Sequence, residues 1–133
     1  QYDMAIADIN KAIELNPNDP YAYNNRVDVY NKKGQYDSAI EDFTSAIRLN
    51  HPKLIFPYGN RAHSYLKKKQ YDKQVEDLNK AIALGWDGAD VYSMRGTAHW
   101  MTGNREKAVA DWQKACDMGY SGGCKNVEWA KNR

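Results

Sequence analysis

Four related segments decide the fold of this sequence. They are Tyr2-Asp3-Met4-Ala5-Ile6, Tyr36-Asp37-Ser38-Ala39-Ile40, Tyr71-Asp72-Lys73-Gln74-Val75 and Arg105-Glu106-Lys107-Ala108-Val109. The first residues of successive segments lie 34, 35 and 34 positions apart. A constant period of this size indicates a repeat architecture in which each copy is one supersecondary unit.

Each period contains two stretches with helical spacing. Tyr23, Val27 and Tyr30 recur at i, i+4 and i+7, and so do Ala39, Phe43 and Ala46. This spacing puts each set on one face of an α-helix. Residues that break helices fall between the periodic stretches, namely Pro17, Pro20, Pro52, Pro57, Gly34 and Gly103. We therefore expect eight helices and no strands, over 2–15, 20–33, 36–49, 54–68, 71–84, 88–101, 105–118 and 122–131.

Composition narrows the functional classes. The 133 residues are 42% hydrophobic and 27% charged, with a formal net charge of +2. The chain is therefore not a disordered polypeptide, and it lacks the concentrated charge that nucleic-acid binding requires. We expect no nucleic-acid partner and no membrane insertion, since no apolar run is long enough to span a bilayer.

The sequence carries none of the common catalytic motifs. It has no glycine-rich dinucleotide or phosphate loop, no His-Glu-x-x-His and no Gly-x-Ser-x-Gly. Its histidines, His51, His63 and His99, are isolated from one another. We therefore expect no enzyme activity, no catalytic residues, no metal site and no cofactor.

Charged residues recur with the repeat. Arg26, Arg61 and Arg95 occupy equivalent positions, and an aspartate recurs in each copy at Asp8, Asp42, Asp77 and Asp111. The arginines could grip an anion, or they could pair with the aspartates along the seam between helices. The one-to-one matching favours the pairing, because a stacking interface must repeat in every copy.

The residues quoted above resemble the tetratricopeptide repeat family, whose unit is a helix-turn-helix of 34 residues. The copy at 20–53 matches the family's pattern at Tyr23, Tyr30, Gly34, Tyr36, Ala39, Phe43 and Ala46. The departures are Val27 at a small-residue position, Gln74 in place of Ala, Lys69 in place of Gly, and one extra residue in the linker at His51-Pro52.

The resemblance implies an all-α, right-handed α-solenoid of about eight helices stacked as antiparallel pairs. We assign residues 1–18 to the second helix of a truncated repeat, 19–53, 54–87 and 88–120 to three repeats, and 121–133 to a capping helix.

The resemblance also implies a function, because the family binds peptides or partner proteins in a concave groove lined by the first helix of each repeat. Carrying the family's inward positions across predicts a groove formed by Tyr21, Asn24, Asn25, Asp28, Phe56, Asn60, His63, Lys67, Asp90, Met94, Thr97, Trp100 and Met101. Of these, Asn24, Asn25 and Asn60 could equally be solvated helix-surface residues. Asn24, Asp28, Asp90 and Met94 stand where a clamp for the C-terminal carboxylate of heat-shock chaperones needs cations or Asn, so we expect no such clamp.

The C-terminal end resembles the cysteine-containing Sel1-like relatives of the family. In these proteins a cysteine pair with the spacing of Cys116 and Cys124 bridges one helix end to the next helix start. The resemblance implies a disulfide in an oxidising compartment, whereas in a cytosol both residues would be buried thiols.

An alternative function is self-assembly. The first helix carries Ile6, Ile9 and Ile13 but lacks the preceding helix that normally covers such a face. This arrangement predicts a truncated fragment or a homo-oligomer that associates through that face. We therefore expect a non-catalytic protein-binding scaffold, with a self-assembly unit as the alternative.

Overall fold

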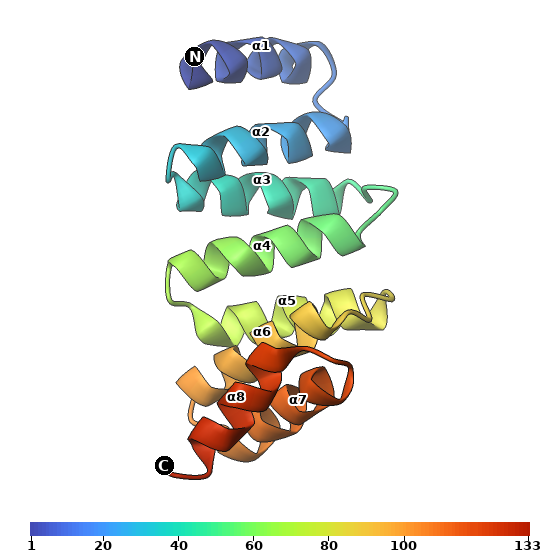
Figure 1. Ribbon diagram of the computed structural model, residues 1–133. Coiled ribbons are helices and arrows are strands. Elements are labelled where there is room, and N and C mark those ends of the chain that lie inside the picture. Colours follow the sequence, from blue (N-terminus) through green and yellow to red (C-terminus); the bar gives the residue numbers. More distant parts are fainter. The chain divides into compact units, whose positions relative to one another are not determined.

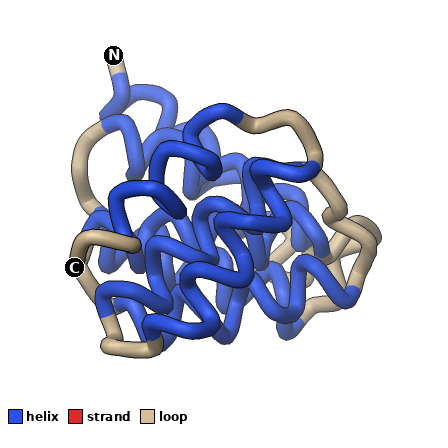
Figure 2. The backbone as a smooth tube through the Cα atoms, turned by 60° about the horizontal axis from the view of Figure 1, so that its bottom comes forward, coloured by secondary structure: helices blue, strands red, loops and turns tan.

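The chain folds into eight α-helices joined by short turns, and the computed structural model describes all residues from 1 to 133 (Figures 1 and 2). No strand is present, and every helix end agrees with the predicted one to within one residue. The helices are α1 (Tyr2–Leu15), α2 (Pro20–Lys32), α3 (Tyr36–Arg48), α4 (Ile55–Lys67), α5 (Tyr71–Ala83), α6 (Ala89–Met101), α7 (Arg105–Asp117) and α8 (Ser121–Ala130).

The helices pack as two compact units. Unit 1 comprises residues 1–69 with α1 to α4, and unit 2 comprises residues 70–133 with α5 to α8. Within unit 1 each helix packs against the next one in the chain, and the tightest pair is α2 with α3. Within unit 2 the closest partners are α6 with α7, followed by α7 with α8.

The core of each unit is built from the predicted alternation of small and large side chains. Ala39, Phe43 and Ala46 of α3 are completely shielded from solvent, and Val27 of α2 packs against them. In unit 2 Trp112 takes the place of Phe43 and is 3% exposed. Small residues let the helix backbones approach each other, and the large rings fill the space that remains.

The tight turns after α2 and α6 use glycine as predicted. Gly34 and Gly103 have φ angles of 75° and 85°, in the left-handed region that glycine adopts without strain. Gly34 lets the N–H of Gln35 reach back to the carbonyl oxygen of Tyr30 at 2.8 Å, which closes the end of α2. The corresponding turn after α4 places Lys69 at a φ of 59°, so a lysine adopts the conformation that glycine takes elsewhere.

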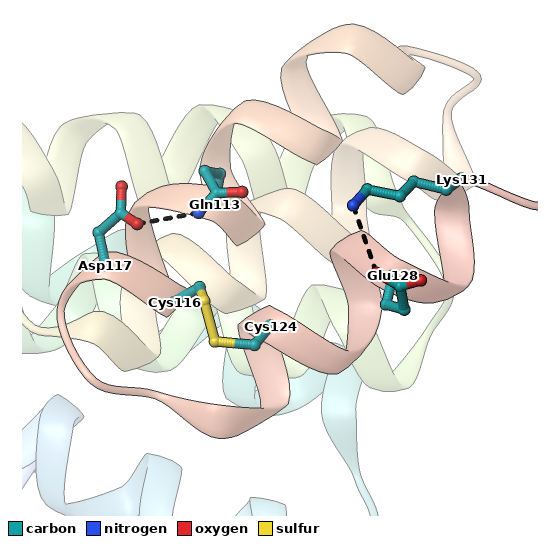
Figure 3. The surroundings of a disulfide bond; sticks show 6 residues. All are labelled: Gln113, Cys116, Asp117, Cys124, Glu128 and Lys131. Atoms are coloured by element: carbon teal, nitrogen blue, oxygen red, sulfur yellow. Dashed lines mark hydrogen bonds and ion pairs between the residues drawn. A yellow bond between two sulfur atoms is a disulfide. The ribbon is translucent and has the colours of Figure 1, made fainter.

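A disulfide joins the last turn of α7 to the first turn of α8. Cys116 and Cys124 are bonded, with their Cα atoms 4.7 Å apart (Figure 3). The two helices approach closely because Gly123 is buried between them, where a Cβ atom would lie 2.6 Å from the carbonyl oxygen of Trp112. Both the covalent bond and the missing side chain therefore fix α8 against α7.

Candidate peptide-binding surfaces

The recurrent arginines form structural links within each unit. In unit 1 Arg26 donates two hydrogen bonds to the carboxylate of Asp42, both of 2.7 Å, and a third of 2.7 Å to the side-chain oxygen of Asn10. The guanidinium therefore ties α2 to both α1 and α3. It also lies over the rings of Tyr23 and Tyr30, at 5.7 and 5.6 Å from their centroids.

Unit 2 repeats the same arrangement. Arg95 donates to both carboxylate oxygens of Asp111 at 2.8 and 2.9 Å and to Asn79 at 2.9 Å. In α4 of unit 1, Arg61 donates to the hydroxyl of Thr44 at 3.0 Å and lies over Tyr58 and Tyr65. At Arg26 and Arg95 every guanidinium nitrogen is already engaged, so these residues are seam links and not an anion grip.

In unit 1 most of the predicted groove residues are exposed to solvent. Tyr21 and Phe56 are each 52% exposed, which is a large apolar area for aromatic rings. The rings of Tyr21 and the buried His51 lie 4.7 Å apart, so the α3–α4 linker supports one side of Tyr21. The predicted polar groove residues of α2 and α4 that are exposed are Asn25, Asp28, Asn60, His63 and Lys67.

The surroundings of two polar residues on these helices affect their side chains. Asn24 is half-buried, and its side-chain oxygen has no hydrogen-bond partner. Partial burial of the ring and the neighbouring charge of Lys67 lower the pKa of His63, which favours its neutral imidazole. The hydroxyl of Ser64 donates to the side-chain oxygen of Asn31 at 3.1 Å and thereby holds α4 against α2.

Unit 2 contains a cavity of about 450 Å³ between α6, α7 and α8, which we call the Trp pocket. Its walls are Thr97, Trp100, Trp112, Lys125, Asn126 and Trp129. The ring of Trp100 stands between the two other indoles, 5.5 Å from Trp112 and 5.1 Å from Trp129, the latter in an edge-to-face arrangement. A volume in this range is typical of sites that hold small ligands or side chains.

The three indoles differ in their exposure. Trp112 is buried, and its indole N–H donates to the hydroxyl of Thr97 at 3.3 Å. Trp100 is half-buried, and Trp129 is 44% exposed. The pocket therefore has a fixed buried wall at Trp112 and an accessible edge at Trp129.

The remaining predicted residues of α6 do not line the Trp pocket. Asp90 accepts a hydrogen bond from the N–H of Val91 at 2.9 Å in the first turn of α6. Met94 is half-buried, and Met101 is 53% exposed. Only Thr97 and Trp100 of the predicted set contribute to the pocket walls.

Sequence reasoning missed four residues of the Trp pocket, namely Trp112, Lys125, Asn126 and Trp129. The sequence predicted only a capping helix here, and Val127 and Ala130 of α8 are half-buried in that role. One signal was present, since Lys125 and Trp129 are four residues apart and share a face of α8. A helix that covers the end of a repeat must also meet the first helix of that repeat.

Two classes of feature are absent from the chain. No helix is both long enough and apolar enough to cross a membrane. No group of three or more His, Cys, Asp or Glu side chains is placed to hold a metal ion.

Similar solved structures establish the fold class of the chain. The chain superposes on MamA 41-end from Desulfovibrio magneticus RS-1 with a TM-score of 0.89 at 21% identity, and the match covers 99% of this chain and 75% of that one. It also superposes on the first TPR of Spaghetti bound to an HSP90 peptide, with a TM-score of 0.74 at 23% identity over 85% of this chain and 90% of that one. The fold is therefore an all-α helical solenoid.

Sequence matches then identify the repeats. Tetratricopeptide repeat family models match residues 9–41 and 57–84. The chain is 45% identical over 49 residues to small glutamine-rich tetratricopeptide repeat-containing protein 2 of Mycosarcoma maydis, and 39% identical over 51 residues to tetratricopeptide repeat protein 36 of Caenorhabditis elegans. These segments are 37% and 38% of this chain but only 14% and 28% of the relatives. Residues 9–41 and 57–84 therefore each match a tetratricopeptide repeat.

Proposed function

We propose that the chain is a non-catalytic scaffold that binds a peptide or a partner protein on the first helices of its repeats. The observation that carries this proposal is the exposure of two aromatic rings, Tyr21 and Phe56, on α2 and α4. Exposed aromatic rings flanked by amides such as Asn25 and Asn60 suit an extended peptide, since the rings bury apolar area and the amides pair with a backbone.

Similar structures support the proposal without settling the ligand. One of them is the TPR of Spaghetti with an HSP90 peptide bound. In this chain Asn24, Asp28, Asp90 and Met94 replace residues that a carboxylate clamp for such a peptide requires, so we infer a different ligand. The net charge of +2 also argues against nucleic acid as the partner.

We also propose that the C-terminal stretch that contains Cys116 and Cys124 is a Sel1-like end. The bond between Cys116 and Cys124 links the end of α7 to the start of α8, which is the connection that such an end would make. By the same assignment residues 1–18, 19–53, 54–87, 88–120 and 121–133 are a partial repeat, three repeats and a cap.

Affinity capture tests the scaffold proposal. The parent chain is used as bait in a lysate beside two variants, one with Asn25→Ala, Phe56→Ala and Asn60→Ala, the other with Trp100→Ala in addition. A matched control carries Glu41→Ala, Glu76→Ala, Lys80→Ala and Glu106→Ala, which change exposed residues of the second helices. Circular dichroism establishes that each variant is folded.

We expect the parent and the control to capture the same polypeptides, and at least one of the two groove variants to lose them. If all four chains capture the same set, the first helices do not bind the partner and the scaffold proposal fails in this form. If only copies of the chain itself are recovered, self-association takes its place.

A second candidate is self-assembly through α1. No residue of α1 is fully buried: the predicted contact residues Ile6, Ile9 and Ile13 are half-buried, and Met4 and Leu15 are 73% and 84% exposed. Exposed apolar side chains of this kind are candidate contacts between copies. Light scattering over a concentration series separates the two functions, because a strict monomer excludes a self-assembly role for α1.

A further inference from the structure

The walls of the Trp pocket are suited to an aromatic guest. Trp112 is held in place by its hydrogen bond to Thr97, and Trp129 remains 44% exposed at the accessible edge. Aromatic rings prefer edge-to-face or offset partners at centroid distances of about 4.5–7 Å, as Trp100 already shows with its two neighbours. A further ring from a ligand can extend this stack.

The charged residues around the pocket favour a negatively charged ligand. Lys125 lines the pocket, is exposed and forms no ion pair, and the lining contains no carboxylate. Glu128, on the same helix, is already paired with Lys131 at 3.3 Å (Figure 3). An acidic group on the ligand would therefore meet a cation without a competing carboxylate in the lining.

The same charges disfavour a cationic guest. Tryptophan cages bind ammonium groups through the ring faces. Here the guanidinium of Arg105 already lies 4.8 Å from the centroid of Trp100, and that of Arg133 lies 4.9 Å from Trp129. A lysine-like or methylated ammonium ligand would be repelled by these two guanidinium groups and by Lys125, whereas an uncharged ring would not.

We propose that the Trp pocket binds an aromatic side chain of an acidic peptide, with Lys125 pairing with a carboxylate next to that side chain. This inference rests on the proposed function and names the chemical class of its ligand. Asn126 is half-buried at the pocket wall, and its amide offers both a donor and an acceptor to the peptide backbone beside the aromatic residue.

Three fluorescein-labelled peptides of equal length test the ligand class by fluorescence anisotropy. The first has a single Phe flanked by Asp, the second replaces the Phe by Ala, and the third replaces each Asp by Lys. We expect the first peptide to bind about tenfold or more tightly than either of the others, since each lacks one of the two recognised groups.

Four variants then assign the binding to the pocket. Trp129→Ala removes the exposed wall and Lys125→Glu reverses the charge, and each should weaken the acidic Phe peptide about tenfold or more. The controls are Met118→Ala, a residue as exposed as Trp129, and Lys107→Ala, an exposed cation of α7 outside the pocket walls. Both controls should bind the peptide as the parent does.

Equal affinity for the Phe and Ala peptides, or for the Asp and Lys peptides, would overturn the ligand class. Binding that survives both Trp129→Ala and Lys125→Glu would overturn the location. In either case the scaffold proposal stands if the lysate partners still depend on Asn25, Phe56 and Asn60. Tight binding of the Lys peptide with loss in Trp129→Ala would instead identify a cation cage.

Discussion

The carboxylate of Asp42 is a buried charge that depends on a single partner, Arg26. Its side chain is 5% exposed and accepts two hydrogen bonds from Arg26. Removing the partner of a buried charge costs about 3–5 kcal/mol, because the remaining charge has neither water nor a counter-ion. We expect Arg26→Leu to lower the free energy of unfolding by about 3 kcal/mol, measured by urea denaturation.

A double variant and a surface control make this prediction specific. Arg26→Leu combined with Asp42→Leu should recover most of the loss, since no charge is then left buried. Lys33→Ala breaks the exposed pair with Asp3 and should change stability little. Equal effects of Arg26→Leu and Lys33→Ala would mean that the seam pairs are not structural.

Lys69 tests the cost of a left-handed backbone at a single residue. Its φ of 59° is the conformation that Gly34 takes at 75° in the equivalent turn. A residue with a Cβ atom is destabilised by about 1–2 kcal/mol in this conformation. Glycine avoids this cost, but it loses more conformational entropy on folding, which offsets part of the gain. Lys69→Gly should therefore stabilise the chain by about 0.5–1 kcal/mol.

The reciprocal change is Gly34→Ala, which should destabilise the chain by about 1 kcal/mol. Thermal unfolding followed by circular dichroism measures both variants. The backbone argument would be refuted by two variants whose midpoints move in the same direction.

The protonation of His99 makes the stability of the fold sensitive to acid. Burial lowers its pKa, and the charges of Arg95 and Lys107 act in the same direction while Asp111 opposes them. Between the lowered pKa and the unfolded value of about 6.5, the unfolded chain binds a proton that the folded chain does not. Stability from this residue is therefore complete above about pH 6.5 and declines as the pH falls below it.

The other two repeats carry a tyrosine at this position, namely Tyr30 and Tyr65. His99→Tyr should therefore lose less stability than the parent between about pH 7.5 and 5.5. Urea denaturation at the two pH values measures the difference, and a residual decline is expected because the pKa of His63 is also lowered. An unchanged pH profile in the variant would show that His99 does not contribute.

At the scale of one element, α8 depends on a short covalent loop. The bond between Cys116 and Cys124 closes a loop with a sequence separation of 8, for which chain entropy gives a stabilisation of roughly 2–3 kcal/mol. We expect Cys124→Ser to lower the unfolding midpoint and to speed hydrogen exchange in α8. Reductant should have the same effect on the parent and none on the variant.

The helices were predictable because their determinants are local. The spacing of Ala39, Phe43 and Ala46 and the glycine turn at Gly34 lie within single repeats and set helix type and ends. The same residues carried the resemblance to the tetratricopeptide repeat family, whose models match residues 9–41 and 57–84.

The Trp pocket was not predictable from that pattern. Thr97 and Trp100 came from the family's register, but Lys125 and Trp129 enter the pocket only because α8 packs against α6 and α7. That approach depends on the buried Gly123, whose role is visible only in three dimensions. At Gln74 the sequence shows only a departure from the repeat pattern. Its burial, at 1% exposure, and the lack of a hydrogen-bond partner for its side-chain oxygen follow from the structure alone.

At the scale of the whole molecule, burial is distributed unevenly along the chain. Helix α1 buries no residue, whereas α3 in the same unit buries Ala39, Asp42, Phe43 and Ala46. Helices with few buried contacts open locally at a small cost in free energy. Hydrogen exchange should therefore be fastest in α1 and slowest in α3 within unit 1, and Leu15→Asp should leave the unfolding free energy nearly unchanged because Leu15 is 84% exposed.

The same measurement at two protein concentrations distinguishes the two functions of the chain. If the chain is a scaffold whose α1 is free, exchange in α1 is independent of concentration, because nothing covers its exposed side chains. If copies associate through α1, exchange slows in that helix at high concentration while α3 is unaffected, and Met4→Asp with Leu15→Asp restores the fast rate. We expect the concentration-independent result, and a slowing confined to α1 would instead establish it as the contact between copies.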